Sequence, residues 1–303
     1  MWLSMSACTG ADLVLGDGRS TRPDAVDAAQ AMPSLPDFGA PSVIAELESD
    51  AGADDDPSLT GDLLGLCFNS KRSGGLGEED IWCSRRAGPD EAWGRPEPQV
   101  QLNSEHRETG IALALDGLTV WFSSDRDGGP GGLDVYVSSR PSLDEAWSTP
   151  TLLPELSSSG DDLVSALDET GRSLWLAQRE RDTEDDDDPA RAYDIMVAER
   201  LTPGAAWQPP QPVPELNTEE AESDAFPIGA GLALIYSRGG DLILTTRRTL
   251  DAPFEPGEPM HALNSDHDER DAWTNSAFDY IVFSSDRAGS HRLYEASRSI
   301  QER

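Results

Sequence analysis

The sequence predicts an all-β fold assembled from five copies of one four-stranded unit. Two observations carry this prediction. An aromatic residue and a leucine recur at fixed spacing, and each copy contains short apolar segments rich in β-branched and aromatic residues. In ALALDGLTVWF these segments alternate around Asp116-Gly117, which is typical of two strands joined by a tight turn.

An aromatic anchor opens each copy. Successive anchors are 55, 54, 60 and 47 residues apart, and a leucine follows each anchor by nine positions. The anchors are Phe38, Trp93, Trp147, Trp207 and Phe254, and the leucines are Leu47, Leu102, Leu156, Leu216 and Leu263. Prolines punctuate the segment between anchor and leucine, so it suits a short strand at a sheet edge, where a missing N–H costs little.

An arginine ends the next apolar strand in every copy, and an acidic residue begins the following strand in four copies. The arginines are Arg72, Arg126, Arg179, Arg238 and Arg287, and the acids are Asp80, Asp134, Asp194 and Asp241, with Arg292 in the fifth copy. The distance between the two features varies from three to fifteen residues, so insertions fall in one loop. The stretch FSSDRDGGPGGLDVY contains a roomy version of this loop, which disfavours a dedicated calcium site there.

Four strands repeated at about fifty residues are the signature of propeller blades. We therefore predict a five-bladed β-propeller of four-stranded antiparallel blades over residues 38–303. The repeat units span about 38–92, 93–146, 147–206, 207–253 and 254–303. The first anchor segment precedes every three-strand set and none follows the last, so we expect an N-terminal strand to complete the last blade and remove exposed sheet edges.

With FSSDRDGGPGGLDVY as its most specific match, the chain resembles the WD-like β-propeller repeats of TolB-type bacterial envelope proteins. The resemblance covers about residues 38–303. It implies a cell-envelope location and protein partners, although such an analogy rests on the fold. TolB-type propellers commonly have six blades, so five blades are a departure from that pattern.

The first 37 residues are rich in Ala, Asp, Pro and Ser, which predicts a disordered tether. Within them, Met5-Ser6-Ala7-Cys8 resembles the lipobox of bacterial lipoproteins, without a basic segment before it and with only seven residues preceding the cysteine. Cys8 is therefore either a lipidation site or a free cysteine. No apolar run approaches the length of a membrane span.

Two further cysteines, Cys67 and Cys83, fall on neighbouring predicted strands. They would form either a cross-strand disulfide, as expected in a periplasmic or secreted protein, or a pair of buried thiols.

The formal net charge of −34 disfavours nucleic-acid binding, because phosphate backbones are repelled. It favours a basic partner or a cation-bridged one, and we expect a monomer. An acid stands six residues after the leucine in four copies: Glu108, Asp162, Glu222 and Glu269. These carboxylates either form a binding ring at the mouth of the channel, or pair with the repeated arginines and cap turns.

No nucleophile elbow, zinc-protease motif or phosphate-binding loop is present, and no catalytic set, metal site or cofactor is assigned. A lectin stabilised by structural calcium is a third reading. Asp224 and Asp271 break the repeat, as the catalytic acids of five-bladed glycosidases do, but neither receives a role. The sequence therefore predicts a non-catalytic envelope or exported scaffold that binds protein or glycan, with a glycoside hydrolase as the alternative.

Overall fold

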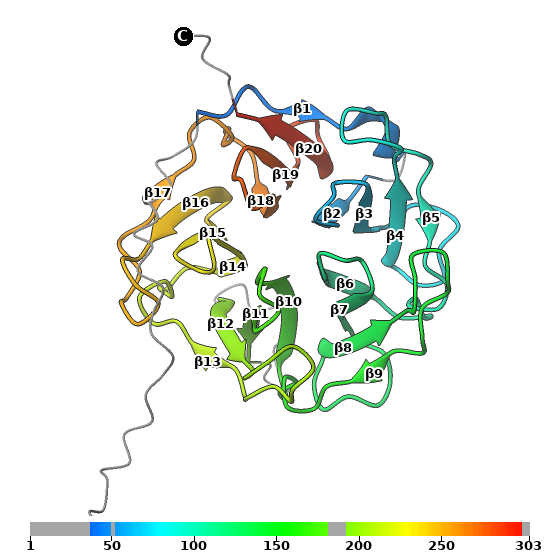
Figure 1. The fold of residues 1–303 in the computed structure, drawn as a ribbon, viewed down its shortest axis with the longest axis horizontal. Helices are drawn as coiled ribbons and strands as arrows, with labels where there is room; N and C mark the ends of the chain where they lie inside the picture. Colours follow the sequence, from blue (N-terminus) through cyan, green and yellow to red (C-terminus); the bar gives the residue numbers. More distant parts are fainter. Residues whose placement is uncertain (1–36, 50–51, 181–191, 299–303) are drawn as a thin grey trace, which may run out of the picture. The chain divides into compact units, whose positions relative to one another are not determined.

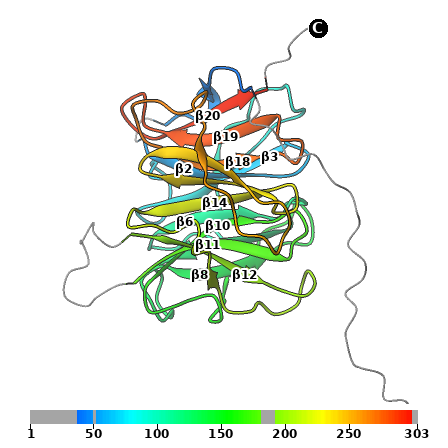
Figure 2. The same cartoon turned by 90° about the vertical axis from the view of Figure 1, so that its left-hand side faces the viewer.

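The computed structural model describes residues 37–49, 52–180 and 192–298. These residues form five four-stranded antiparallel sheets arranged around a central axis (Figure 1), and Figure 2 shows the same sheets from the side. The prediction of a five-bladed β-propeller is confirmed. We number the blades in chain order and list the strands of each blade from the axis outward.

Blade 1 contains β2 (Asp54–Leu59), β3 (Gly65–Ser70), β4 (Asp80–Arg85) and β5 (Glu97–Pro98). Blade 2 contains β6 (Glu108–Leu113), β7 (Thr119–Ser124), β8 (Asp134–Ser139) and β9 (Thr151–Leu152). Blade 3 contains β10 (Asp161–Leu167), β11 (Ser173–Arg179), β12 (Asp194–Glu199) and β13 (Gln211–Pro212). The proline-punctuated segments give outer strands of only two residues.

Blade 4 contains β14 (Glu222–Ile228), β15 (Ala233–Arg238), β16 (Asp241–Thr246) and β17 (Glu258–Pro259). Blade 5 contains β18 (Glu269–Thr274), β19 (Tyr280–Ser285) and β20 (Arg292–Ser297), and its outer strand is β1 (Ser42–Val43) from the start of the chain. The predicted closure by an N-terminal strand is therefore confirmed. A single 3-10 turn, η1 (Ala45–Leu47), follows β1.

The repeated anchors and leucines fill the interfaces between blades. Each of the five buried apolar clusters contains one anchor and one leucine of the repeat. Trp93 and Leu47, for example, pack with Phe68 of blade 1 and Trp273 of blade 5. This is why the sequence repeats at the length of one blade: each interface needs one large aromatic side chain, whose removal typically costs about 3–5 kcal/mol.

The inner strands share a bulge near their starts. Register shifts interrupt the pairing of β2, β6, β10, β14 and β18 with their neighbours. In four blades a residue of left-handed conformation lies at the bulge: Asp56, Gly110, Asp224 and Asp271 have φ of 51°, 59°, 57° and 57°. The bulge turns these positions toward the axis. We call the side where the inner strands begin the start face, and the side where they end the end face.

Candidate functional site

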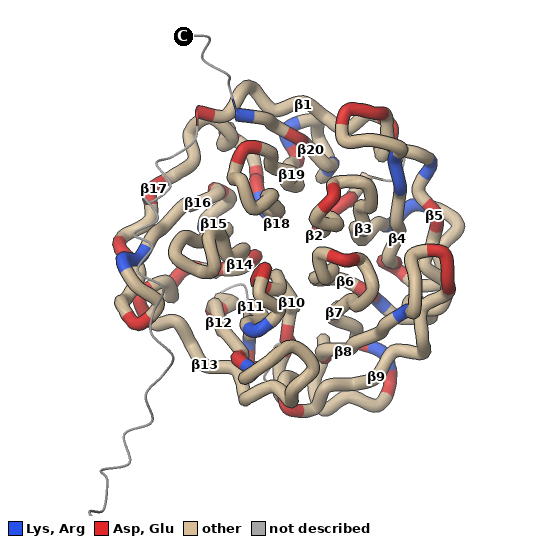
Figure 3. Tube along the Cα trace, in the orientation of Figure 1, with Lys and Arg blue, Asp and Glu red and all other residues tan. Residues whose placement is uncertain are grey.

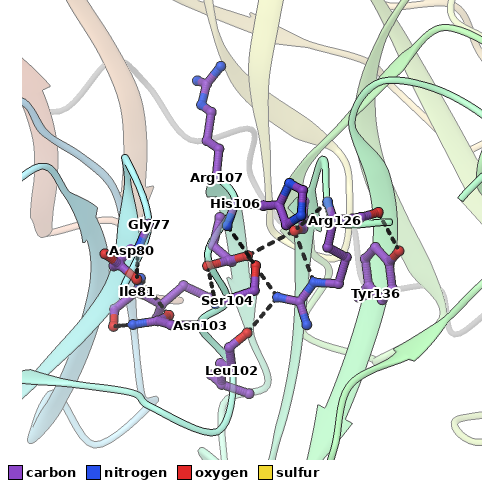
Figure 4. Close-up of polar contacts among 12 residues, drawn as sticks. Gly77, Asp80, Ile81, Leu102, Asn103, Ser104, His106, Arg107, Arg126 and Tyr136 are labelled. Atoms are coloured by element: carbon purple, nitrogen blue, oxygen red, sulfur yellow. Dashed lines mark hydrogen bonds and ion pairs between the residues drawn. The ribbon is translucent and has the colours of Figure 1, made fainter. Parts of the chain in front are cut away.

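The acid predicted to form a ring in blade 2, Glu108, is fully buried. Its carboxylate accepts hydrogen bonds from the amide (2.8 Å) and Oγ (2.5 Å) of Ser104, from Oγ of Ser124 (2.9 Å) and from Nη2 of Arg126 (2.9 Å). Arg126 also donates to the carbonyl of Leu102, the leucine of the repeat (2.6 Å; Figure 4). Three features of the repeat thus form one buried connection that fastens the inner strand to the preceding loop.

The same connection recurs in blades 1 and 5. Nη2 of Arg287 lies 3.0 Å from Glu269 and donates to the carbonyl of Leu263, while Arg72 contacts Asp54 (2.7 Å) and the carbonyl of Leu47. Asp54 stands one residue later than the sequence repeat requires, so the spacing missed it as the fifth member of the ring.

Blades 3 and 4 vary the arrangement. Asp162 accepts from Ser158 and from Nε2 of Gln178 (2.5 Å), while Arg179 pairs with the neighbouring Asp161. Glu222 accepts from the amide and hydroxyl of Thr218. Burial raises the pKa of Asp162 to about 6.

The four predicted ring residues have no exposed surface, with 0% relative exposure for Glu108, Asp162, Glu222 and Glu269. The structure places them in the alternative arrangement, where they pair with arginine or close a turn. With no exposed surface in this conformation they would not contact a docked partner directly, and the binding ring stays a prediction.

Two of the acids that begin the third strands accept hydrogen bonds from backbone amides of the loop before the strand. Asp134 accepts from the amide of Gly131, and Asp80 from the amides of Leu76 and Gly77. A Cβ added at Gly129 would lie 1.7 Å from Oδ2 of Asp134, so the loop reaches this carboxylate only with glycine there. Asp194 is exposed and Asp241 is half-buried.

Three aspartates meet at the axis, one from each of three inner strands. Asp56, Asp224 and Asp271 each offer a carboxylate oxygen within 4.8 Å of the others, and this is the single such cluster of potential metal ligands in the part of the chain that is described. Asp56 accepts from the amide of Gly110 (2.8 Å) and Oγ1 of Thr109 (2.9 Å). Asp224 and Asp271 are the residues that break the sequence repeat. Sequence reasoning missed Asp56, although it occupies the same bulge position.

Burial and repulsion between carboxylates raise the pKa of two of these aspartates, Asp56 and Asp271. Burial, with the charge of Asp224 second, raises the pKa of Asp56 to about 7, and the same causes raise the pKa of Asp271. Nε of Arg270 lies 3.5 Å from Oδ2 of Asp271 and offsets part of the repulsion. The cluster can share protons or hold a metal ion. Its cavity of about 10 Å³ has room for one water-sized particle.

A serine, a histidine and two aspartates gather at the start face beside Arg270. His291 lies between Oγ of Ser284 (3.0 Å) and the carboxylate of Asp268 (3.4 Å). The order of these groups is that of a hydrolase triad, but Ser284 is fully buried and donates its hydroxyl proton to Asp55 (2.5 Å). Ser284 therefore has no exposed oxygen in this conformation, and its contacts with Asp55 and His291 link β19 to neighbouring segments.

A second arginine repeat, which sequence reasoning missed, lies toward the end face. In four blades an arginine guanidinium stacks over the aromatic anchor, with its Cζ 4.1 to 4.5 Å from the ring centroid. The pairs are Arg86 with Trp93, Arg140 with Trp147, Arg200 with Trp207 and Arg247 with Phe254. Each Nε donates to a carbonyl of the turn after the inner strand. The sequence spacing could have shown this repeat, because each of these arginines precedes its anchor by seven residues.

Cys67 and Cys83 are directly opposite each other on β3 and β4 and form a disulfide. The bond favours an exported, non-cytoplasmic protein. Cys8 and the predicted tether lie outside the described residues. Within the described part of the chain, no helix is long and apolar enough to cross a membrane.

No family model and no curated protein matches the chain, so membership of the WD-like repeats stays a prediction. Solved structures do match. The catalytic domain of the GH62 α-L-arabinofuranosidase from Coprinopsis cinerea aligns over 88% of this chain and 98% of its own, at 10% identity and a TM-score of 0.52. A putative TolB from Agrobacterium tumefaciens aligns over 84% and 79%, at 13% identity and a TM-score of 0.48. An exo-1,5-α-L-arabinanase from a bovine ruminal metagenomic library aligns over 82% and 93%, at 13% identity and a TM-score of 0.48. At these identities the likeness shows the fold alone.

Proposed function

We propose that this chain is an exported, non-catalytic binding scaffold of the bacterial cell envelope, a TolB-like propeller that docks a basic protein partner. The observation that carries the proposal is the geometry at the axis. Hydrolysis of a glycosidic bond uses two carboxyl groups about 5–10 Å apart with a sugar between them. Here one oxygen of each axial carboxylate lies within 4.8 Å of the others, and the cavity beside them has a volume of about 10 Å³, which is too small for a sugar ring.

The exposed side chains favour protein over glycan. Each tryptophan in the described residues is buried, including Trp207 and Trp147 at 5% exposure, so none offers an open ring for a sugar to stack on. The exposed large apolar residues there are instead aliphatic: Leu76, Val100, Leu115, Leu143, Leu201 and Leu250. Acidic residues occur on all five blades (Figure 3), which suits a basic partner.

The test asks first whether the chain cleaves sugars. The full chain and its Asp224→Asn variant are incubated with arabinan, xylan and an aryl arabinofuranoside, and released sugar is measured. We expect no release. Release by the wild type that disappears in Asp224→Asn would overturn the proposal in favour of the hydrolase alternative.

The second half of the test compares ligands. The full chain is screened against short peptides and against a glycan array, at low and high salt. We expect basic peptides to bind and their binding to weaken as salt screens the charges. Retention on glycans alone would contradict a protein partner.

A further inference from the structure

The end face contains a pocket on the axis of the propeller, lined by apolar side chains together with polar ones such as Thr274 and Asn275. Its volume is about 120 Å³, and its walls include Leu113 of β6, Phe226 and Ile228 of β14, Trp273 of β18, and Leu115 in the turn after β6. A cavity of about 150 Å³ accepts a benzene-sized group, so this pocket has the size of one large aliphatic side chain.

The axial pocket continues into a groove between blades 2 and 3. Leu115, Leu167 and Glu169 belong to the walls of both, and the groove has a volume of about 740 Å³. Leu115 is 44% exposed where the two meet. Together they form one surface from the axis to the rim, long enough for an extended peptide segment rather than a single small molecule.

The groove is negatively charged. Asp116 and Glu169 are exposed in its walls, and Glu155 is half-buried there. Among the described residues that line it, Arg200 is the single basic one. Its guanidinium stacks on Trp207, and its Nε donates to the carbonyl of Gly171 (2.7 Å), so it does not neutralise these carboxylates. Glu169 also accepts a hydrogen bond from the amide of Ala230 (3.1 Å), which leaves its negative charge in place. An occupant with positive charge would therefore be attracted to these carboxylates.

We propose that the axial pocket and the groove between blades 2 and 3 together bind an extended segment of a partner protein that carries a large aliphatic side chain next to lysine or arginine. The aliphatic side chain fills the axial pocket, and the cationic groups lie against Glu169, Asp116 and Glu155. This inference rests on the proposed function and names the face and the chemistry of the partner.

The groove between blades 5 and 1 provides a matched comparison. It is larger, about 990 Å³, and it is also acidic: its walls include Glu46, Asp90, Glu91, Asp279 and Glu295, together with Arg86 and Arg298. It differs in its connection to the axis, because it shares only the polar Asn275 with the axial pocket. A segment in this groove would therefore lack a continuous apolar path to the axial pocket.

The experiment selects short random peptides displayed on phage against the full chain, then measures the affinity of synthetic copies by fluorescence polarisation. Two variants alter the proposed surface, Glu169→Lys by charge and Leu115→Asn by polarity. Two matched controls change residues outside it: Glu91→Lys, and Leu201→Asn at a leucine with 82% exposure. Circular dichroism confirms that all four fold.

We expect selected peptides to pair leucine or isoleucine with lysine or arginine. Glu169→Lys and Leu115→Asn each weaken their binding about tenfold or more, and the controls change it by less than about twofold. Unchanged affinity in both surface variants, or selected peptides without the basic and aliphatic pair, overturns the inference. Loss confined to Glu91→Lys overturns the location while leaving the scaffold function standing. Failure to select any peptide overturns the inference, and sugar release in the hydrolysis assay overturns the proposed function with it.

Discussion

Replacing Glu108 by glutamine tests whether the buried carboxylates stabilise the blades. The carboxylate accepts four hydrogen bonds from Ser104, Ser124 and Arg126, all within 2.9 Å. The amide nitrogen of glutamine cannot accept, so at least one of these donors loses its partner, and Arg126 loses its counter-ion at a side chain that is only 17% exposed. Hydrogen bonds to charged groups contribute about 1.5–3 kcal/mol each, and breaking a buried pair costs about 3–5 kcal/mol.

Because Arg126 keeps some contact with water, we expect Glu108→Gln to lower the free energy of unfolding by about 3 kcal/mol. For a domain of this size that loss lowers Tm by roughly 6–12 °C. Urea denaturation followed by circular dichroism gives the free energy, and scanning calorimetry gives Tm.

Two matched variants sharpen this prediction. Glu97 is exposed on β5, so Glu97→Gln is expected to change stability by less than about 0.5 kcal/mol. The carboxylate of Glu222 accepts hydrogen bonds from the amide and hydroxyl of Thr218, while Arg238 lies 4.0 Å from the exposed Glu220. Glu222→Gln is therefore expected to cost less stability than Glu108→Gln. Equal losses for Glu108→Gln and Glu222→Gln, or a loss below about 1 kcal/mol for Glu108→Gln, would refute the role assigned to the arginine pairing.

Three further predictions concern the axis, the disulfide and the loop between β7 and β8. The pKa of Asp56 is raised to about 7, above its ordinary value of 3.8, so the folded state favours the protonated form, and stability should fall as pH rises from about 4 through 7. Asp224→Asn removes a repelling charge and should raise Tm at pH 8 more than at pH 5, and an equal change at both would contradict this account. Reducing Cys67–Cys83 reopens a loop with a sequence separation of 16 and should cost about 3 kcal/mol, seen as a lower urea midpoint in dithiothreitol that is absent from a Cys67→Ser/Cys83→Ser variant. Gly129→Ala should destabilise, because its Cβ would overlap Asp134, whereas Gly88→Ala, with its nearest atom at 3.4 Å, should change Tm little; similar effects in the two would argue against the overlap.

The sequence predicted the blades well because each interface between them repeats one set of contacts. An anchor and a leucine recur because every interface between blades buries one of each, and an arginine recurs at the end of each second strand. The third strands begin at the predicted acids, such as Asp80 and Asp134. Spacing could not show that the predicted ring would be buried, because burial depends on how neighbouring blades pack.

The axial cluster could be predicted only in part. Asp224 and Asp271 stood out by breaking the repeat, but their meeting with Asp56 depends on the number of blades and on the way the ring closes. Asp56 itself was hidden because blade 1 carries one extra residue between Leu47 and its buried acid, Asp54. A bulge with left-handed φ leaves no clear mark in a sequence when its residue is aspartate rather than glycine.

The pairing of β1 with β20 also determines the order in which this protein can complete its fold. Ser42 pairs with Glu295 and Val43 with Tyr294. Strand β1 therefore cannot pair until β20, more than 240 residues later in the chain, has been synthesised. Contacts between distant parts of a chain form slowly, because closing a long loop costs entropy before any bond repays it. Until β20 emerges, the outer edge of blade 5 and the interface that Phe38 covers stay open. The ring therefore cannot close before β20 is available, and a nascent chain stalled before β20 would be a substrate for chaperones rather than a smaller propeller.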